Sequence, residues 1–239
     1  MTTIKVMSYN IRSGYGMDDV QDLERIASVI AAEQPDLVAL NEVDQVTERS
    51  KGMDQAAQLA ELLGYHHVFG PAIAYQGGHY GNALLSKQWI TASHNQQLPI
   101  HPEATDEPRA LLHGTVELAS GEQLEVLVTH LGLAAEERAL SLPFIADYAQ
   151  ALVPVVLLGD FNIRQHNQYG EMSPLHPVLR DTATLTGQAG SEALYSFPAD
   201  EPAITIDYIW VSEGVQTESL RVIHTEASDH LPLVAELKL

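Results

Sequence analysis

Polar side chains stand at the ends of several apolar runs in this chain, where they could meet and do chemistry. The run PVVLLG ends in Asp160 and, two residues later, Asn162. Burying an unpaired carboxylate costs free energy, so a carboxylate at the end of a buried strand is usually compensated or functional. Three other runs end in the same way, at Asn10, Glu42 and His130. We therefore expect these side chains to form one polar rim.

Two further polar groups lie among apolar residues near the C-terminus. Asp207 lies inside the run ITIDYIW, and Asp229 and His230 come directly before the run LPL. A carboxylate inside such a strand needs a partner, and a hydrogen bond that orients a histidine is a common solution.

The residue types in this set point to phosphoester hydrolysis. Carboxylates and amides are hard oxygen ligands, which favour Mg²⁺ or Mn²⁺ over zinc. Two histidines could suit zinc, but the chain has no HExxH motif and no cysteine. Hydrolysis of a phosphoester needs an oriented water, charge relief on the phosphoryl oxygens and help for the leaving oxygen. The set contains groups for all three tasks.

The hydrophobic pattern predicts which elements carry these residues. Helical spacing covers 20–33, 53–63 and 134–150. Strand-like runs cover 3–9, 36–40, 65–69, 80–85, 89–98, 110–118, 123–130, 154–160, 204–211, 216–224 and 231–237. Long loops are expected at 164–177 and 186–203.

Two strand–helix–strand segments have similar lengths. Asn10 and Glu42 are 42 − 10 = 32 residues apart, and His130 and Asp160 are 160 − 130 = 30 apart. Each is about the size of one βαβ unit. Two sheets packed face to face, with helices outside, would bury both sets of strands. Ligands of α/β sheets bind beyond the carboxyl ends of strands, where this rim falls.

Seven motifs carry a resemblance to a known family. They are SYNIR, LNEVD, GNALLS, VTHLG, GDFN, IDYIW and SDHLPL, in this order and over residues 4–237. The chain resembles the endonuclease/exonuclease/phosphatase superfamily, which includes deoxyribonuclease I, apurinic/apyrimidinic endonucleases, neutral sphingomyelinases and inositol polyphosphate 5-phosphatases. The resemblance implies an α/β four-layer α-β-β-α sandwich, in which two mixed sheets pack together with helices outside. It also implies phosphoester hydrolysis that depends on Mg²⁺, with Mn²⁺ as a possible substitute.

The resemblance also implies roles for individual residues. Glu42 would be the principal metal ligand, helped by Asn10 and Asp229. Asp160 would orient or activate the attacking water, while Asn162 and His130 hold the scissile phosphate. His230 would contact the phosphoryl oxygens and be oriented by Asp207. The general base is either Asp160 or the Asp207–His230 pair.

Three further residues are candidate substrate contacts. Arg109 lies in a loop (DEPRALL) ahead of the strands that lead to His130, where this superfamily often carries an arginine, although a surface charge is the alternative. Asn82, in GNALLS, resembles a family position near the site. Tyr80 belongs to the glycine-rich segment 70–81, which either borders the substrate pocket or is an ordinary flexible loop.

Composition limits the substrate and the location. The 239 residues, 45% of them hydrophobic, suit one catalytic domain over residues 1–239. There is no signal-peptide pattern and no apolar stretch near the ~20 residues of a membrane span, so we expect a cytoplasmic protein without a transmembrane segment. The absence of cysteine leaves the redox compartment undetermined.

Charge favours a compact substrate. Twelve Lys and Arg against 32 Asp and Glu give a net charge of −20, which disfavours tight binding of nucleic acid. We therefore expect a small phosphodiester, phosphomonoester or lipid headgroup. A nuclease acting on DNA or RNA is the alternative, although Arg12 stands where the DNA-repair branch usually has an acidic residue. A non-catalytic binding module on the same fold is a third possibility, which the presence of Glu42, Asp160 and His230 disfavours.

Overall fold

The structure is a computed structural model that describes residues 2–101, 107–164 and 168–239. Its strands are β1 (Thr3–Asn10), β2 (Leu37–Gln45), β3 (His66–Tyr75), β4 (Gly78–Ser86), β5 (Ile90–Gln97), β6 (Ala110–Glu117), β7 (Gln123–His130), β8 (Val155–Asp160), β9 (Leu179–Asp181), β10 (Asp207–Ser212), β11 (Gln216–Val222) and β12 (Leu233–Lys238). Its longer helices are α1 (Leu23–Glu33), α2 (Gln55–Leu63) and α3 (Ala135–Ala149). Shorter helical turns are η1 (Arg12–Gly14), α4 (Gln168–Glu171), η3 (Ser173–Leu175), α5 (Thr182–Leu185) and η4 (Glu192–Leu194).

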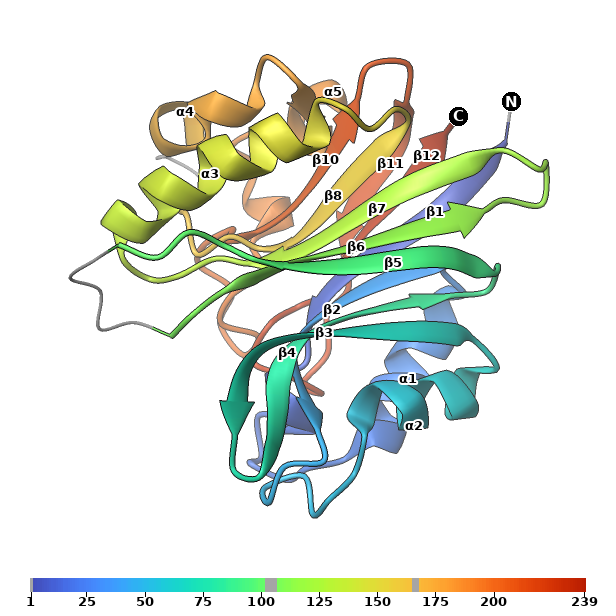
Figure 1. The fold of residues 1–239 in the computed structure, drawn as a ribbon, viewed down its shortest axis with the longest axis vertical. Helices are drawn as coiled ribbons and strands as arrows, with labels where there is room; N and C mark the ends of the chain where they lie inside the picture. The colour runs from blue at the N-terminus through green and yellow to red at the C-terminus, as the bar shows by residue number, and fades with distance from the viewer. Residues whose placement is uncertain (1, 102–106, 165–167) are drawn as a thin grey trace.

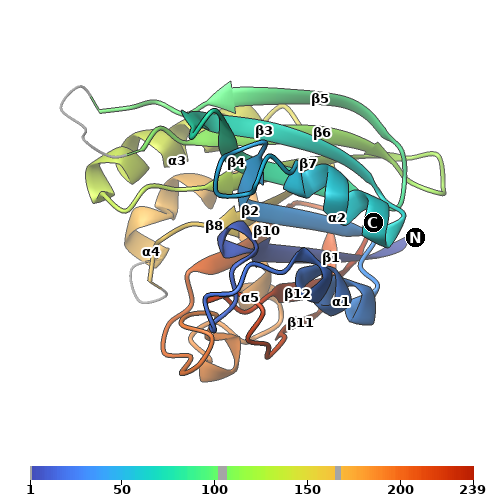
Figure 2. The same cartoon turned by 90° about the horizontal axis from the view of Figure 1, so that it is seen from below.

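Two six-stranded mixed sheets pack face to face between layers of helices (Figure 1). The first sheet has the strand order β11-β12-β1-β2-β4-β3, and the second has the order β5-β6-β7-β8-β10-β9. Helices α1 and α2 cover the outer face of the first sheet, and α3 covers the outer face of the second (Figure 2). This is the α/β four-layer sandwich that the sequence predicts.

Helices α1 and α2 begin at aspartate caps. The Asp22 side chain accepts a hydrogen bond from the backbone N–H of Arg25 at the start of α1, and Asp54 does the same for Ala57 in α2. Such caps satisfy backbone donors that lack a partner within the helix. Helix α2 ends at Leu63 and is capped by Gly64, whose φ of 70° suits glycine.

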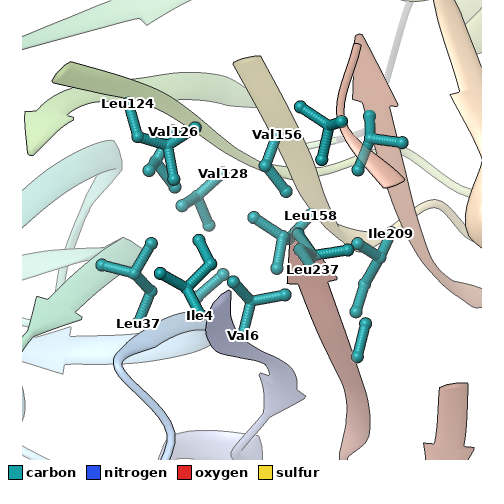
Figure 3. Packing of buried hydrophobic residues seen from close by; sticks show 14 of the residues in the cluster. Ile4, Val6, Leu37, Leu124, Val126, Val128, Val156, Leu158, Ile209 and Leu237 are labelled. Carbon is teal, nitrogen blue, oxygen red and sulfur yellow. The ribbon is translucent and has the colours of Figure 1, made fainter. Parts of the chain in front are cut away.

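The core lies between the sheets and again beneath each helical layer. Along β8, Val156 and Leu158 point toward the opposite sheet, while Val155 and Leu157 point toward α3. The interior between the sheets also contains Ile4, Val6, Leu37, Leu124, Val126, Val128, Ile209 and Leu237 (Figure 3). Burying each such side chain contributes about 1.5–3 kcal/mol. A strand that is buried on both faces therefore holds the polar residue at its end in a fixed position.

Strand register brings the polar ends together. In the second sheet, Asp160 pairs with His130 of the parallel strand β7 and with Asp207 of the antiparallel strand β10. In the first sheet, Asn10 of β1 pairs with Asn41 of β2. Strands β1 and β8 also face each other across the core. Side chains from both sheets therefore meet at one edge of the sandwich.

The structure corrects three expectations about local structure. The segment 70–81 is a β-hairpin of β3 and β4 instead of a loop. Strand β2 does not end at Glu42 but continues to Gln45, through an irregularity in its pairing with β4 at this residue. The short elements β9 and α5 were not predicted, because each has too few residues for a recognisable hydrophobic period.

Among the described residues, no helix combines the length and apolar character needed to cross a membrane.

Candidate active site

Asp160 lies at the centre of the polar cluster. Its Oδ2 atom accepts a hydrogen bond from Asn10 Nδ2 at 3.1 Å. The Nε2 atoms of His130 and His230 lie 3.5 and 3.6 Å from the same oxygen. The other oxygen, Oδ1, accepts from the backbone N–H of Asn162 at 2.9 Å. Burial raises the pKa of Asp160, and His230 beside it offsets part of this shift.

His230 is held by a buried carboxylate. Its Nδ1 lies 2.9 Å from Asp207 Oδ2, which also accepts a hydrogen bond from Ser196 Oγ at 2.6 Å. Burial disfavours the imidazolium, but Asp207 and Asp160 outweigh burial and raise the pKa of His230 to about 10. His230 is therefore a cation at neutral pH, with Nε2–H directed toward Asp160.

His130, in contrast to His230, is a neutral ring. Arg109 Nη1 lies 3.2 Å from His130 Nδ1, and a guanidinium can only donate, so Nδ1 accepts. Burial, Arg109 and His230 together hold the pKa of His130 well below its usual range. The ring is therefore neutral, with its proton on Nε2. Asn162 Nδ2 donates to the carbonyl of Leu131 at 2.9 Å. It also lies 3.2 Å from Nε2, but an amide nitrogen is a donor, so with the ring proton on Nε2 this contact is not a hydrogen bond.

Glu42 lies at the irregularity in β2. Its φ of 56° belongs to the left-handed region, and a bulge of this kind redirects the side chain relative to a regular strand. Asn10 Nδ2 donates to Glu42 Oε1 at 3.0 Å. Burial raises the pKa of Glu42, the hydrogen bond from Asn10 lowers it, and nearby Asp229 raises it.

Two groups of side chains could hold a cation. Asp160, Asp207 and His230 each place a ligand atom within 4.8 Å of the others. However, the hydrogen bond to Asp207 and the raised pKa mean that His230 carries protons where a metal needs lone pairs. Glu42 and Asp229 are instead two neighbouring carboxylates, and a divalent ion would relieve both burial and repulsion there. Their oxygens, with the amide of Asn10, suit Mg²⁺.

A cavity of about 440 Å³ opens onto this cluster. Of the predicted site residues, the cavity lining includes Glu42, Tyr80, Arg109, His130, Asp160, Asn162, Asp229 and His230. Asn10 and Asp207 are buried behind this lining and reach it through Glu42 and His230.

Asn82 is a different case. It is fully buried and hydrogen-bonds to Asn41 and to the carbonyl of Ala110, and it is not part of the cavity lining. The structure therefore gives Asn82 a place between the two sheets, away from the position expected for a substrate contact.

Two polar residues of the site escaped the sequence analysis. Asn41 Nδ2 donates to Asn82 Oδ1 and to the carbonyl of Thr129, and its Oδ1 accepts from the backbone N–H of Asp160. This one side chain connects the two sheets directly behind the central carboxylate. The feature of the sequence that could have identified Asn41 is its place next to Glu42 at the end of an apolar run. Ser196 lies in a loop, where nothing in the sequence marks it as a partner of Asp207.

Comparison with known proteins assigns the family. The Endonuclease/Exonuclease/phosphatase family matches residues 7–230, and the chain belongs to this family. Among curated proteins, it is 25% identical over 252 residues to the Uncharacterized protein YbhP of Escherichia coli (strain K12), an alignment that covers 99% of this chain and 97% of that protein.

Solved structures agree in fold. The endonuclease/exonuclease/phosphatase from Beutenbergia cavernae DSM 12333 is similar, with a TM-score of 0.87 and 30% identity over 99% of this chain and 72% of that one. The human Nocturnin catalytic domain, solved with a bound sulfate anion, has a TM-score of 0.73 and 26% identity over 99% of this chain and 93% of that one.

Proposed function

We propose that this protein is a Mg²⁺-dependent hydrolase of compact phosphoesters. The observation that carries this proposal is the convergence on Asp160 Oδ2, with Asn10 at 3.1 Å, His130 at 3.5 Å and His230 at 3.6 Å. A carboxylate between a neutral imidazole and an imidazolium can take a proton from water while both rings donate to a phosphate. Membership of a family named for nucleases and phosphatases supports the same reaction class.

The polar side chains of the cavity would bind different parts of the phosphate group. His130 donates from Nε2, and Asn162 holds the adjacent position through its amide. Arg109 supplies a second charge next to His130, and its side chain is only 13% exposed. His230, oriented by Asp207, places a positive charge where the phosphoryl oxygens gain negative charge in the transition state.

Asp160 is a better general base than His230. A cationic imidazole has no lone pair to accept a proton, and the carboxylates near His230 keep it cationic. Burial moves the pKa of Asp160 upward, toward the range in which a base works efficiently at neutral pH. Asp160 would therefore take the proton of the attacking water.

Glu42 would hold the divalent ion, with Asn10 and Asp229 beside it. When bound, Mg²⁺ would neutralise charge on a phosphoryl or leaving oxygen. Asn10 keeps Glu42 and Asp160 in fixed relation, because its Nδ2 donates to both carboxylates.

Cavity size and charge support a compact substrate. A volume of about 440 Å³ is in the range of small-molecule sites. In the described part of the chain, Arg109 and Arg164 are the only Lys or Arg that line the cavity. Two guanidiniums can accompany one phosphate group, but they offer little to a long polyanion when the net charge is −20.

A hydrolysis screen with Mg²⁺ or Mn²⁺ tests the proposal. It should include p-nitrophenyl phosphate, bis-p-nitrophenyl phosphate, sphingomyelin, inositol phosphates and plasmid DNA, at ~0.15 M salt to screen weak polyanion binding. We expect metal-dependent turnover of at least one small ester. Plasmid nicking without small-ester turnover would favour a nuclease, and no turnover of any kind would contradict the proposal.

A further inference from the structure

Four apolar side chains contribute to the lining of the cavity. They are Leu133, Phe197, Ile204 and Ile206, and we refer to them as the apolar wall. They come from the segment after β7 and from the segments that precede β10. The polar cluster described above and the apolar wall therefore share one cavity.

Most of the apolar wall is held rigidly by backbone hydrogen bonds. Phe197 and Ile204 form an antiparallel bridge in which each N–H donates to the other's carbonyl at 3.1 Å. The carbonyl of Ile206 accepts from the backbone N–H of Phe161, one residue after Asp160. Ile204 and Ile206 are two residues apart, as side chains on one face of an extended segment must be. This surface exists before any substrate binds.

The apolar wall directly adjoins the reacting groups. The ring centroid of Phe197 lies 4.8 Å from that of His230, with the planes tilted by 48°. Phe197 therefore lies directly beside the position at which His230 would contact a phosphate.

Leu133 is exposed, yet its backbone is fixed. Its side chain is 74% exposed, the highest value among the large hydrophobic residues described. Arg138 is buried and donates from Nη1 to the carbonyls of Leu133 at 2.6 Å and Gly132 at 3.1 Å. The same guanidinium binds Glu171 through Nη2 at 2.8 Å. The anchored backbone fixes the position of this exposed side chain in the cavity lining.

We infer that an organic group of the substrate next to the scissile phosphate is apolar and packs on the apolar wall. This inference rests on the proposed function and specifies its substrate class. The apolar wall presents no side-chain donor or acceptor. A hydroxyl-rich group placed against it would lose hydrogen bonds to water without replacement, whereas an alkyl or aryl group would gain from burial.

Paired esters of similar length test the inference. One pair is two p-nitrophenyl phosphodiesters whose second group is n-hexyl or 2-(2-methoxyethoxy)ethyl, so that the leaving group is constant. The other pair is the two phosphomonoesters of the same alcohols, assayed by release of inorganic phosphate. With Mg²⁺, we expect kcat/KM to be about tenfold or more higher for the hexyl ester of whichever pair is hydrolysed.

Two variants test whether the preference for the hexyl ester depends on the apolar wall. Leu133→Gln should bring the ratio of the two kcat/KM values toward one, because it places an amide on the apolar wall. Leu62→Gln is the matched control, since Leu62 is an exposed leucine on α2 and is not part of the cavity lining. This control should keep the wild-type ratio.

The outcomes separate the two claims. A wild-type ratio of the two kcat/KM values near one, or an unchanged ratio in Leu133→Gln, would overturn the inference about the apolar wall. Either result would leave the proposed function intact. If none of these four esters is hydrolysed, the hydrolysis screen described above decides the proposed function, and calorimetry with the corresponding two phosphonates decides the inference. Tighter binding of n-hexylphosphonate would support the apolar wall, and equal binding of the two would overturn it.

Discussion

The Nδ1 atom of His230 lies 2.9 Å from Oδ2 of Asp207, although 23 residues separate them along the chain. Both side chains are almost completely buried. The carboxylate stabilises a proton on the ring and fixes the ring plane, so that Nε2 faces Asp160 at 3.6 Å. This pair therefore favours a positively charged His230 at neutral pH.

Removing the charge of Asp207 tests its role in orienting His230. Asp207→Asn keeps the shape and can still hydrogen-bond, so we expect a folded protein. Its kcat should fall by about 10²–10⁴-fold, because the ring loses its fixed orientation and its charge. The assay is steady-state kinetics on the best small ester. The exposed Asp200→Asn serves as control, and a wild-type kcat in Asp207→Asn would show that this residue is only structural.

The pKa values of the two buried histidines should be shifted in opposite directions from the ordinary value. Asp207 and Asp160 raise the pKa of His230 to about 10, whereas burial and Arg109 hold the pKa of His130 well below 6.5. Histidine-selective NMR of the metal-free protein should therefore show a cationic His230 and a neutral His130 between pH 6.5 and 9. Assignment would use His130→Gln and His230→Gln.

The same shift makes stability depend on pH. The pKa of His230 in the folded protein lies above its ordinary value of 6.5. Its stabilising contribution is therefore fully present below pH 6.5 and is lost as the pH rises through about 10. The difference in free energy of unfolding between wild type and Asp207→Asn should narrow from pH 6 to pH 9. A difference that widens over this range would contradict the charge assignment.

Glu42→Gln should weaken metal binding. The substitution keeps the side-chain shape but removes the charge that would bind Mg²⁺. We expect the Kd for Mg²⁺ to rise by about tenfold or more, as measured by calorimetric titration. Glu48→Gln, an exposed change nearby, should leave the Kd unaltered. Equal affinity in wild type and Glu42→Gln would place the metal elsewhere.

Asn41→Ala should destabilise the junction between the sheets. It would leave the backbone N–H of Asp160, the carbonyl of Thr129 and Asn82 Oδ1 without their hydrogen bonds to Asn41. The free energy of unfolding, measured in urea, should fall by about 2–4 kcal/mol. Asn95→Ala removes one half-buried hydrogen bond, to the carbonyl of Pro71, and should cost about 1 kcal/mol. If the two costs were the same, Asn41 would not be a cross-sheet anchor.

Sequence alone predicted the fold well, because the long strands carry strong local signals. An apolar run such as the one before Asp160 is long, buried on both faces and bounded by turn residues. The polar ends of these runs identified most of the groups that the structure brings together. These polar groups meet at one edge of the sandwich because of the strand register, and the similar lengths of the two βαβ segments indicated this arrangement.

Features that depend on neighbours distant in the sequence were not predictable in this way. The bulge at Glu42 depends on pairing with β4. The buried place of Asn82 depends on Asn41 of the neighbouring strand β2 and on the carbonyl of Ala110 in the opposite sheet. The apolar wall unites Leu133 with residues more than 60 positions later, and no local pattern marks such a contact.

Replacing Asp160 tests the central claim most directly. Asp160→Asn keeps a side chain of similar size but removes the carboxylate between His130 and His230 that would accept the proton of the attacking water. We measure kcat for the best small ester at saturating Mg²⁺, with Asp147→Asn on α3 as the exposed control. Calorimetric binding of Mg²⁺ confirms an intact site. The account predicts a fall in kcat of about 10³-fold or more with metal binding retained, and a kcat within tenfold of wild type would contradict it.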